Sequence, residues 1–263
     1  MKKYTIAVST LNIGILQYPI STLEKMEKVE LLIIHQISKE YMDMDFSPYY
    51  TKLQESGFSV RIIVSYALGL SKSRNIAIEN CKTKYILFSD DDNYYVNNLI
   101  DILDKTTINE PLQIYSFKII DHDGQPFKKY PNTEMLHNNR TILRLSSIEN
   151  LYDNEFILKN NIRFNESFGL GAQYPSCEQP IFAKDILNNG GKGKFYPINV
   201  TVHPKENSGD DFFRTIQAKT RRKMFLKMYG FKGWLLITVF YLKKIKSVSI
   251  RNQFMFFYGT FIK

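Results

Sequence analysis

The first 105 residues alternate between short apolar runs and helix-like stretches. The apolar runs are Tyr4–Ser9, Val29–Ile37, Val60–Ser65 and Lys84–Ser89, and the helix-like stretches are Pro48–Ser56, Ser71–Cys81 and Asn93–Lys105. Each apolar run is rich in Ile, Val or Leu and is bounded by polar or turn residues, as buried strands are. Repeated strand–helix units build mostly parallel sheets with helices on their faces, so we expect an α/β domain.

The pattern changes beyond residue 110. We predict strands at Leu112–Asp121, Gly124–Tyr130 and Lys194–His203, the first two joined by a turn at 122–124. We predict helices at Ser147–Lys159 and Glu178–Asn189, with a Gly-rich irregular segment at 164–172 between them. No low-complexity linker interrupts these elements, so we expect residues 1–211 to form one domain.

The net charge of +9 is concentrated at the C-terminus. Residues 212–263 contain twelve Lys and Arg and no Asp or Glu, whereas residues 1–211 contain 23 bases against 26 acids. Apolar residues in this tail recur at steps of four and three, at Met224, Met228, Phe231, Leu235, Thr238 and Leu242. This spacing predicts a basic amphipathic helix that meets a polyanionic surface, either a membrane or a nucleic acid. The alternative is a helix that packs on the main domain.

The two cysteines, Cys81 and Cys177, lie far apart and cannot build a disulfide framework. Polar residues interrupt the first apolar run, and no stretch reaches the roughly 18 apolar residues that a spanning helix needs. We therefore expect a cytoplasmic protein.

Three consecutive carboxylates follow the fourth predicted strand, at Asp90, Asp91 and Asp92. Ligands of open α/β sheets bind at the carboxyl ends of strands. Neighbouring aspartates repel each other unless a cation lies between them, so the triplet favours a site for Mn²⁺ or Mg²⁺. The alternative is a solvated loop that caps the next helix.

A glycine turn precedes the helix predicted before that strand, with the sequence GLSKSRN at residues 69–75. Ser71 is the expected N-cap. Lys72 and Arg74 lie in the first turn, where positive charge opposes the helix dipole. They are favourable there if they face an anion that also meets the helix N-terminus, and they are ordinary surface charges otherwise.

These two segments together resemble the family 2 glycosyltransferases, which have the GT-A fold. The resemblance covers about residues 1–205 and implies a Rossmann-like, GT-A-like catalytic domain over 1–211. Within it, about 1–110 would bind the nucleotide sugar and 111–211 the acceptor, and residues 212–263 would form the helical tail.

The resemblance also assigns roles to single residues. Asp90 and Asp92 would hold the metal, and Asp91 would reach the ribose or the sugar. Ser9 and Thr10 would line the nucleotide pocket, and Lys72 and Arg74 would face the base or the diphosphate. Family members often carry an Asp after the second strand that holds the nucleobase, and here Gln36 takes that place, with both a donor and an acceptor for a uracil edge.

Glu178 follows the Gly-rich segment at the start of a predicted helix. Inverting transfer requires one carboxylate to take a proton from the acceptor hydroxyl. The segment resembles the family's acceptor-side acidic motif, often Glu-Asp, and because Gln179 replaces the second acid only Glu178 can serve as the base. The alternative is an acid that merely stabilises the helix N-terminus. His203, after the last strand, matches a position where the family often has a further metal ligand.

The resemblance implies an inverting, metal-dependent glycosyltransferase of the hexosyl or N-acetylhexosaminyl type. Its donor would be a nucleotide sugar, a UDP-sugar in the first instance, and its acceptor a glycan or a polyprenyl-diphosphate-linked sugar in surface polysaccharide synthesis. With the basic tail, this predicts a peripheral protein at the inner face of the cell membrane that contacts anionic lipid and does not bind nucleic acid.

Three other functions compete with this one. A sugar-nucleotide pyrophosphorylase would carry a basic, Gly-rich loop after the first strand, and residues 9–14 contain one Gly and no base. A nucleic-acid or polyanion-binding protein would use the tail alone and leave the acidic triplet unexplained. A catalytically inactive homologue remains open because of Gln179.

Overall fold

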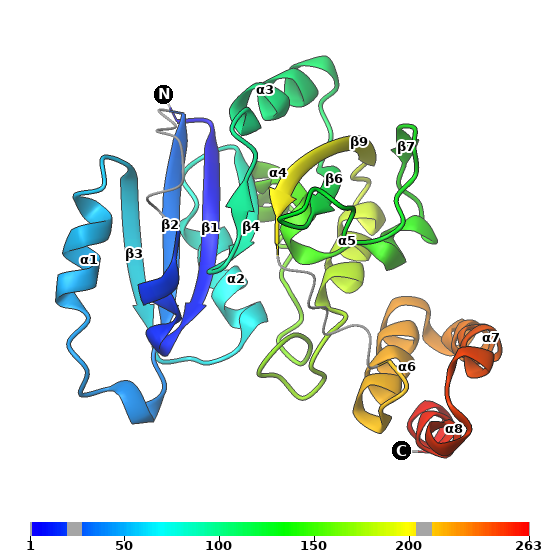
Figure 1. Ribbon diagram of the computed structural model, residues 1–263. Coiled ribbons are helices and arrows are strands. Elements are labelled where there is room, and N and C mark those ends of the chain that lie inside the picture. Colours follow the sequence, from blue (N-terminus) through cyan, green and yellow to red (C-terminus); the bar gives the residue numbers. More distant parts are fainter. Residues whose placement is uncertain (1, 20–27, 204–211, 263) are drawn as a thin grey trace.

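The computed structural model describes residues 2–19, 28–203 and 212–262, and in this part of the chain helices flank both faces of a nine-stranded sheet (Figure 1). The strand order is β3-β2-β1-β4-β8-β6-β9-β5, with β7 paired to β9. The bounds of its first four strands are β1 Tyr4–Leu11, β2 Val29–Gln36, β3 Ser59–Ser65 and β4 Tyr85–Asp90. All four are parallel, with α1 (Ser47–Gln54) and α2 (Leu70–Asn80) in the crossovers.

The second half of the sheet is mixed. Its strands are β5 Tyr94–Tyr95, β6 Ile114–Ile120, β7 Met135–Leu136, β8 Asn150–Asp153 and β9 Gly193–Val202. Each parallel ladder runs over six to eight residue pairs, and each antiparallel ladder over two or three. The predicted fold class, a mostly parallel α/β sheet flanked by helices with a helical C-terminal tail, is therefore confirmed.

Two of the predicted helices are wrong in part. The helix predicted over Asn93–Lys105 begins only at Leu99, as α3 (Leu99–Asn109), because β5 pairs with β9 first. The helix predicted over Ser147–Lys159 divides into a 3-10 turn (Ser147–Glu149), the strand β8 and α4 (Asn154–Lys159). Strand β8 fills the gap between β4 and β6, and this pairing overrides the local helical spacing.

Two further expectations need correction. The turn at 122–124 forms, but residues 124–130 make only an isolated bridge, Ile120 with Pro126, and not a strand. Helix α2 is preceded by Gly69 at φ +125°, and Ser71 makes no capping bond. The Ser71 hydroxyl instead donates to the carbonyl of Phe168, which joins the start of α2 to the Gly-rich segment.

Buried side chains alternate between the two faces of the parallel strands. Along β1, for example, Ile6 and Val8 join one buried cluster and Ala7 joins the other. The first cluster includes Leu99 and Leu103 of α3. The second packs under α2, α4 and α5 (Glu178–Asn188). Each face is therefore covered by helices, and the strand ends are left to form the polar edge of the sheet.

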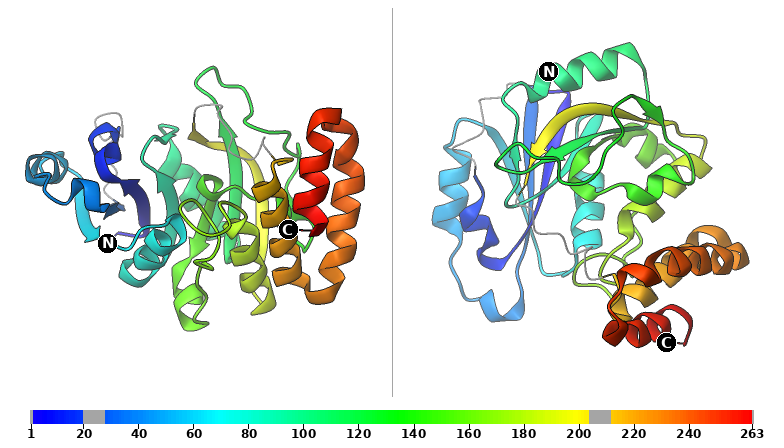
Figure 2. Two further views of the ribbon diagram at one scale, coloured as in Figure 1. Left: turned by 90° about the horizontal axis from the view of Figure 1, so that it is seen from below. Right: turned by 45° about the vertical axis from the view of Figure 1, so that its right-hand side comes forward.

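The tail folds into three helices and not into one. Their bounds are α6 Thr215–Tyr229, α7 Gly233–Lys244 and α8 Ile250–Phe257, followed by a π-helical turn at Tyr258–Ile262. The predicted continuous apolar face is wrong because the chain turns at Gly230, where φ is +57°. Met224 and Met228 belong to the second core cluster, whereas Phe231 and Leu235 are 88% and 69% exposed. Figure 2 shows these helices packed together as a group, next to α5.

Short 3-10 turns complete the chain, at Asn12–Gln17, Lys39–Tyr41, Thr141–Arg144, Gly230–Lys232 and Ile245–Ser247. Among the described residues, none of the helices has both the length and the apolar character required to cross a bilayer.

His137 should make the fold sensitive to mild acid. Burial lowers the pKa of His137 to about 4, and its Nε2 lies 2.6 Å from the Ser116 hydroxyl. The unfolded chain takes up this proton near pH 6.5, so the stability that the neutral ring provides is complete above that pH and is lost as the pH falls toward 4. Between pH 7 and pH 5 the advantage of the wild type over His137→Gln should shrink by about 2 kcal/mol in urea unfolding. Parallel pH dependence of the two proteins would contradict this.

Candidate active site

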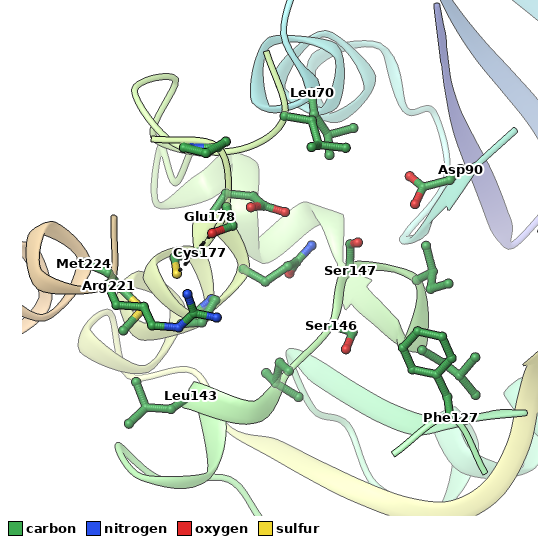
Figure 3. Close-up of a pocket in the computed structure, with 18 of the residues that line it drawn as sticks. Leu70, Asp90, Phe127, Leu143, Ser146, Ser147, Cys177, Glu178, Arg221 and Met224 are labelled. Atoms are coloured by element: carbon green, nitrogen blue, oxygen red, sulfur yellow. Dashed lines mark hydrogen bonds between the residues drawn. The ribbon is translucent and has the colours of Figure 1, made fainter. Parts of the chain in front are cut away.

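Two cavities meet at the carboxyl ends of the parallel strands. The first, here called the strand-end cleft, has a volume of about 850 Å³ and is lined by Ser9, Thr10, Leu11, Gln36, Leu68, Gly69, Leu70, Asp90, Asp91, Asp92, Leu170, Gly171 and His203. The second, here called the helix-side cavity, has a volume of about 390 Å³ and extends past Glu178 to α6 (Figure 3). The two share four lining residues, Leu70, Asp90, Leu170 and His203. A ligand in one cavity can therefore meet a ligand in the other beside Asp90.

Asp90 ends β4, Asp91 and Asp92 follow it, and the three side chains meet different partners. The Thr10 hydroxyl donates to Asp91 Oδ2 at 2.6 Å, and a Cβ at Gly14 would lie 2.1 Å from the same oxygen. The absence of a side chain at Gly14 therefore leaves the room that Asp91 occupies. Asp92 Oδ1 lies 3.5 Å from His203 Nε2, and Asp90 Oδ1 lies 3.5 Å from the Arg74 guanidinium.

The aspartates also differ in acidity. Burial raises the pKa of Asp90, with the Arg74 charge opposing the shift, and burial raises the pKa of Asp91 against the hydrogen bond from Thr10. The hydrogen bond from His203 lowers the pKa of Asp92. Asp92 therefore keeps its negative charge to the lowest pH of the three, which makes it the carboxylate best suited to hold a cation.

Asp92 and His203 fit a divalent cation as a pair. Two ligand atoms on one ion, each about 2.1 Å from it and at right angles, lie about 3 Å apart, close to the 3.5 Å between these two atoms. The described residues contain no cluster of three His, Cys, Asp or Glu side chains that could hold a metal by themselves. A Mg²⁺-type site commonly takes one or two protein ligands and completes its shell with substrate phosphates and water.

Arg74 is fully buried and lines neither cavity. This differs from the predicted position beside the base or the diphosphate. Its Nη1 donates to Glu178 Oε1 at 2.9 Å, and its Nη2 lies 3.5 Å from Asp90. The guanidinium also lies over the rings of Phe88 and Phe164. Helix α2 turns this residue inward, so that it joins Glu178 of the helix-side cavity to Asp90, which lines both cavities. Lys72 is partly exposed and lines neither cavity.

Glu178 is the first residue of α5 and faces the helix-side cavity (Figure 3). The residue before it, Cys177, has φ +72°, so a left-handed turn directs the chain into the helix. The Gly-rich segment closes on the start of α2 through a hydrogen bond from Leu70 N to Leu170 O at 2.9 Å. A Cβ at Gly169 would lie 2.9 Å from the Ser71 hydroxyl and 3.6 Å from Glu178 Cγ, so this glycine permits the close approach.

The remaining predicted residues lie around the cleft. The Ser9 hydroxyl accepts a hydrogen bond from Ser73 at 2.8 Å. Gln36 lines the cleft, but its Nε2 is already bonded to the carbonyls of Ala67 and Gly69, and so it also holds the turn before α2. Gln179 is a largely buried residue in the wall of the helix-side cavity, and its Oε1 accepts a hydrogen bond from the Tyr152 hydroxyl.

Two contributors were missed by sequence reasoning. Gly14 had no local signal, because its role depends on the approach of Asp91 from another strand. Arg221 of α6 lines the helix-side cavity, a role that the sequence analysis gave to no residue of the basic tail. Its spacing of three from Met224, a residue with a buried side chain, could have placed it on the inner face of the helix.

Comparison with solved structures shows the same fold at low identity. S. aureus TarS 1-349 in complex with UDP-GlcNAc matches with a TM-score of 0.67 at 14% identity, over 98% of this chain and 79% of that one. Mannosyltransferase PcManGT from Pyrobaculum calidifontis, in complex with GDP-Man and Mn²⁺, matches with a TM-score of 0.57 at 11% identity, over 98% and 79%. A comparison with curated protein sequences gives no match.

The family model described as glycosyl transferase family 2 matches residues 36–173, which is more than half of the chain. The matched segment contains the acidic triplet, the GLSKSRN turn and the Gly-rich segment. With the shared fold, this match shows that the chain belongs to glycosyl transferase family 2.

Proposed function

We propose that the protein is an inverting, metal-dependent glycosyltransferase that moves a hexosyl or N-acetylhexosaminyl group from a nucleoside diphosphate to a glycan or a polyprenyl-diphosphate-linked acceptor. The observation that carries the proposal is the meeting of two cavities at Asp90, with the aspartate triplet in one and Glu178 in the other. A donor in the strand-end cleft would present its sugar toward the carboxylate in the helix-side cavity.

The strand-end cleft has the chemistry for the donor. Thr10, near the end of β1, donates a hydrogen bond to Asp91 and fixes its carboxylate. The remaining lone pairs of that carboxylate can accept a hydrogen bond from a ribose or sugar hydroxyl. Asp92 and His203 would hold Mn²⁺ or Mg²⁺, which when bound neutralises charge on the departing diphosphate. A UDP-sugar is our first candidate, supported by the TarS complex with UDP-GlcNAc, while the PcManGT complex with GDP-Man makes GDP the alternative to test.

Glu178 would act as the general base. It accepts the proton of the acceptor hydroxyl while the acceptor oxygen bonds to the anomeric carbon and the bond from that carbon to the diphosphate oxygen breaks. The ion pair with Arg74, 2.9 Å from Arg74 Nη1 to Glu178 Oε1, would hold the carboxylate in place for this step. One displacement inverts the anomeric centre and requires no covalent intermediate on the protein.

Nucleotide binding tests the donor half of the proposal. The protein should be stabilised against thermal unfolding by one nucleoside diphosphate, UDP or GDP, in the presence of Mn²⁺ and much less in EDTA. At about one hundred times the dissociation constant the gain should be about 2.7 kcal/mol. Asp92→Ala should lose the response, because it removes one of the two candidate ligands, whereas Asp43→Ala, an exposed aspartate that lines neither cavity, should keep it. No response to either nucleotide would refute the donor site.

The exposed side of the tail suits a membrane surface. Helices α7 and α8 and the turn before α7 expose Phe231, Leu235, Leu242, Ile250 and Phe254, each at least 62% accessible. Basic residues lie among them in sequence, at Lys232, Lys243, Lys244, Lys246 and Arg251. Apolar side chains beside cations bind the headgroup region of anionic bilayers, so we place the protein at the inner face of the cell membrane.

Substituting three of these side chains should release the protein from membranes. The triple variant Phe231→Ser, Leu235→Ser and Phe254→Ser should bind phosphatidylglycerol vesicles at least about 100-fold more weakly, because each buried side chain contributes about 1.5–3 kcal/mol. Ile108→Ser, in α3 and 74% exposed, should bind like the wild type. Sedimentation with vesicles measures both, and unchanged binding of the triple variant would show that the tail is not the contact.

A further inference from the structure

The far wall of the helix-side cavity is built by the tail. Met224, Phe225 and Arg221 of α6 and Phe240 of α7 line it, opposite the carboxylates Asp90 and Glu178. Helix α6 is fixed to the segment before α5 by the Ser176 hydroxyl, which donates to Gln217 Oε1 at 2.7 Å. The tail therefore forms part of the proposed acceptor side of the site.

The charges of this cavity are separated. At one end, the buried Arg74 lies between Glu178 and Asp90 and neutralises part of the charge of both carboxylates. At the other, Arg221 is the one Arg or Lys side chain among the described residues that line the cavity. Figure 3 shows its guanidinium extending from α6 into the space on the Cys177 side of Glu178.

The Arg221 guanidinium is partly removed from water, which is unfavourable for a charged group. Burial lowers the pKa of Arg221, with the nearby Cys177 opposing the shift, and its Nη1 donates to the carbonyl of Gln217 at 3.3 Å. Its guanidinium lies over the ring of Phe240, 5.8 Å from the centroid. A partly desolvated guanidinium that is fixed by a ring and a carbonyl binds oxyanions more strongly than a fully solvated one does.

We infer that Arg221 binds a phosphate or diphosphate group of the acceptor while the apolar wall contacts the carbon chain next to that group. This inference rests on the proposed transferase function, narrows its acceptor to one that carries a phosphate or diphosphate, and adds the residue that recognises that group. Two sources share this chemistry, a lipid-linked diphosphate and a phosphate within a water-soluble polymer. The apolar side chains Leu143, Met224 and Phe225 favour the lipid-linked source.

Binding of farnesyl diphosphate, with farnesol and glycerol 3-phosphate as partial ligands, tests this inference. The titrations are done in EDTA, so that no divalent ion can hold the diphosphate in the strand-end cleft. Arg221→Gln should weaken the binding of farnesyl diphosphate by about tenfold or more, as expected for a lost charge-assisted contact. Lys227→Gln makes the same change of charge on an exposed position of the same helix and should change binding less than about twofold.

Farnesol should bind all three proteins equally, because any contact of its chain with the exposed face of α7 and α8 does not involve Arg221. If glycerol 3-phosphate shows the same loss in Arg221→Gln, the phosphate is sufficient and the soluble source is favoured. If only farnesyl diphosphate shows it, the lipid-linked source is favoured. Equal binding of farnesyl diphosphate to the wild type and Arg221→Gln would overturn the inference.

Cys177 provides a second readout that does not depend on a folded variant. It lines the helix-side cavity, whereas Cys81 is buried at the C-terminal end of α2 and lines neither cavity. Farnesyl diphosphate should slow alkylation of Cys177 in the wild type, and more than farnesol does at the same concentration; lack of protection by farnesyl diphosphate would overturn the inference even if Arg221→Gln does not fold. The nucleotide response in Mn²⁺ should be the same in Arg221→Gln, so failure of the donor site can be distinguished from failure of this one.

Discussion

Glu178→Gln should abolish sugar transfer while leaving the donor response intact. Replacing the carboxylate by an amide removes the group that can accept the acceptor proton, and a general base contributes about 10²–10⁴-fold to such rates. The side chain keeps its shape, so Mn²⁺-dependent stabilisation by the nucleotide should remain within about twofold in affinity. Turnover of the nucleotide sugar, measured as release of the nucleoside diphosphate in the presence of acceptor, provides the rate.

Glu166→Gln is the matched control for this variant. Glu166 is an exposed acid on the same segment, bonded to Asn75 Nδ2 at 3.1 Å, and it lines neither cavity. Its activity should stay near that of the wild type. If Glu178→Gln loses transfer and nucleotide binding together, Glu178 supports the donor site and is not a dedicated base. If it loses neither, the base lies elsewhere.

The donor half of the molecule could be predicted from the sequence because its signals are local. Each parallel strand is a short apolar run, and the polar residues that line the cleft come directly at the strand ends, as Ser9, Gln36 and Asp90 do. Parallel register brings these ends to one edge, with Ser9 opposite both Ile34 and Asp90. The family match and the fold confirm the parallel α/β sheet and the family, while the division into donor and acceptor halves and the roles of the single residues remain proposals.

The acceptor half could not be predicted in the same way because its features depend on distant partners. Strand β8 pairs with β4 on one side and with β6 on the other. Its consecutive apolar residues Leu151 and Tyr152 are also compatible with a helix, so the local sequence does not reveal the strand. The turn at Gly230 divides the tail, so Met224 is buried while Phe231 is exposed. A one-dimensional spacing rule holds only while the chain continues straight.

Arg74 shows the same limit at the centre of the site. Its place after a glycine turn predicts an anion ligand, yet the partners it meets are Glu178, 104 residues further along the chain, and Asp90 at the end of the next strand. The sequence identifies the residue as important but cannot tell a substrate anion from a carboxylate of the protein. The structure assigns it to the two carboxylates and so connects the predicted metal motif with the predicted base.

Arg74→Met should therefore destabilise the protein strongly, by about 3–5 kcal/mol in urea unfolding at pH 7.5, because it leaves two carboxylates near the interior without their cation. Arg163→Met is the matched control. Arg163 also pairs with a glutamate, Glu79, at 3.3 Å, but both side chains are partly exposed, and an exposed pair contributes about 0–1 kcal/mol. Equal, small effects of the two substitutions would mean that the buried ion pair does not stabilise the fold.

The pH dependence of Arg74→Met separates lost charge from lost packing. Burial already raises the pKa of Asp90 and the Arg74 charge opposes that shift, so without the guanidinium the pKa of Asp90 should rise further. The destabilisation is then greatest above the raised pKa and is relieved as the pH falls through it. Adding Glu178→Gln removes one uncompensated charge, and the double variant should be more stable than Arg74→Met alone at pH 7.5. A loss that is independent of pH and unchanged in the double variant would mean that Arg74 acts through its contacts with Phe88 and Phe164 and not through its charge.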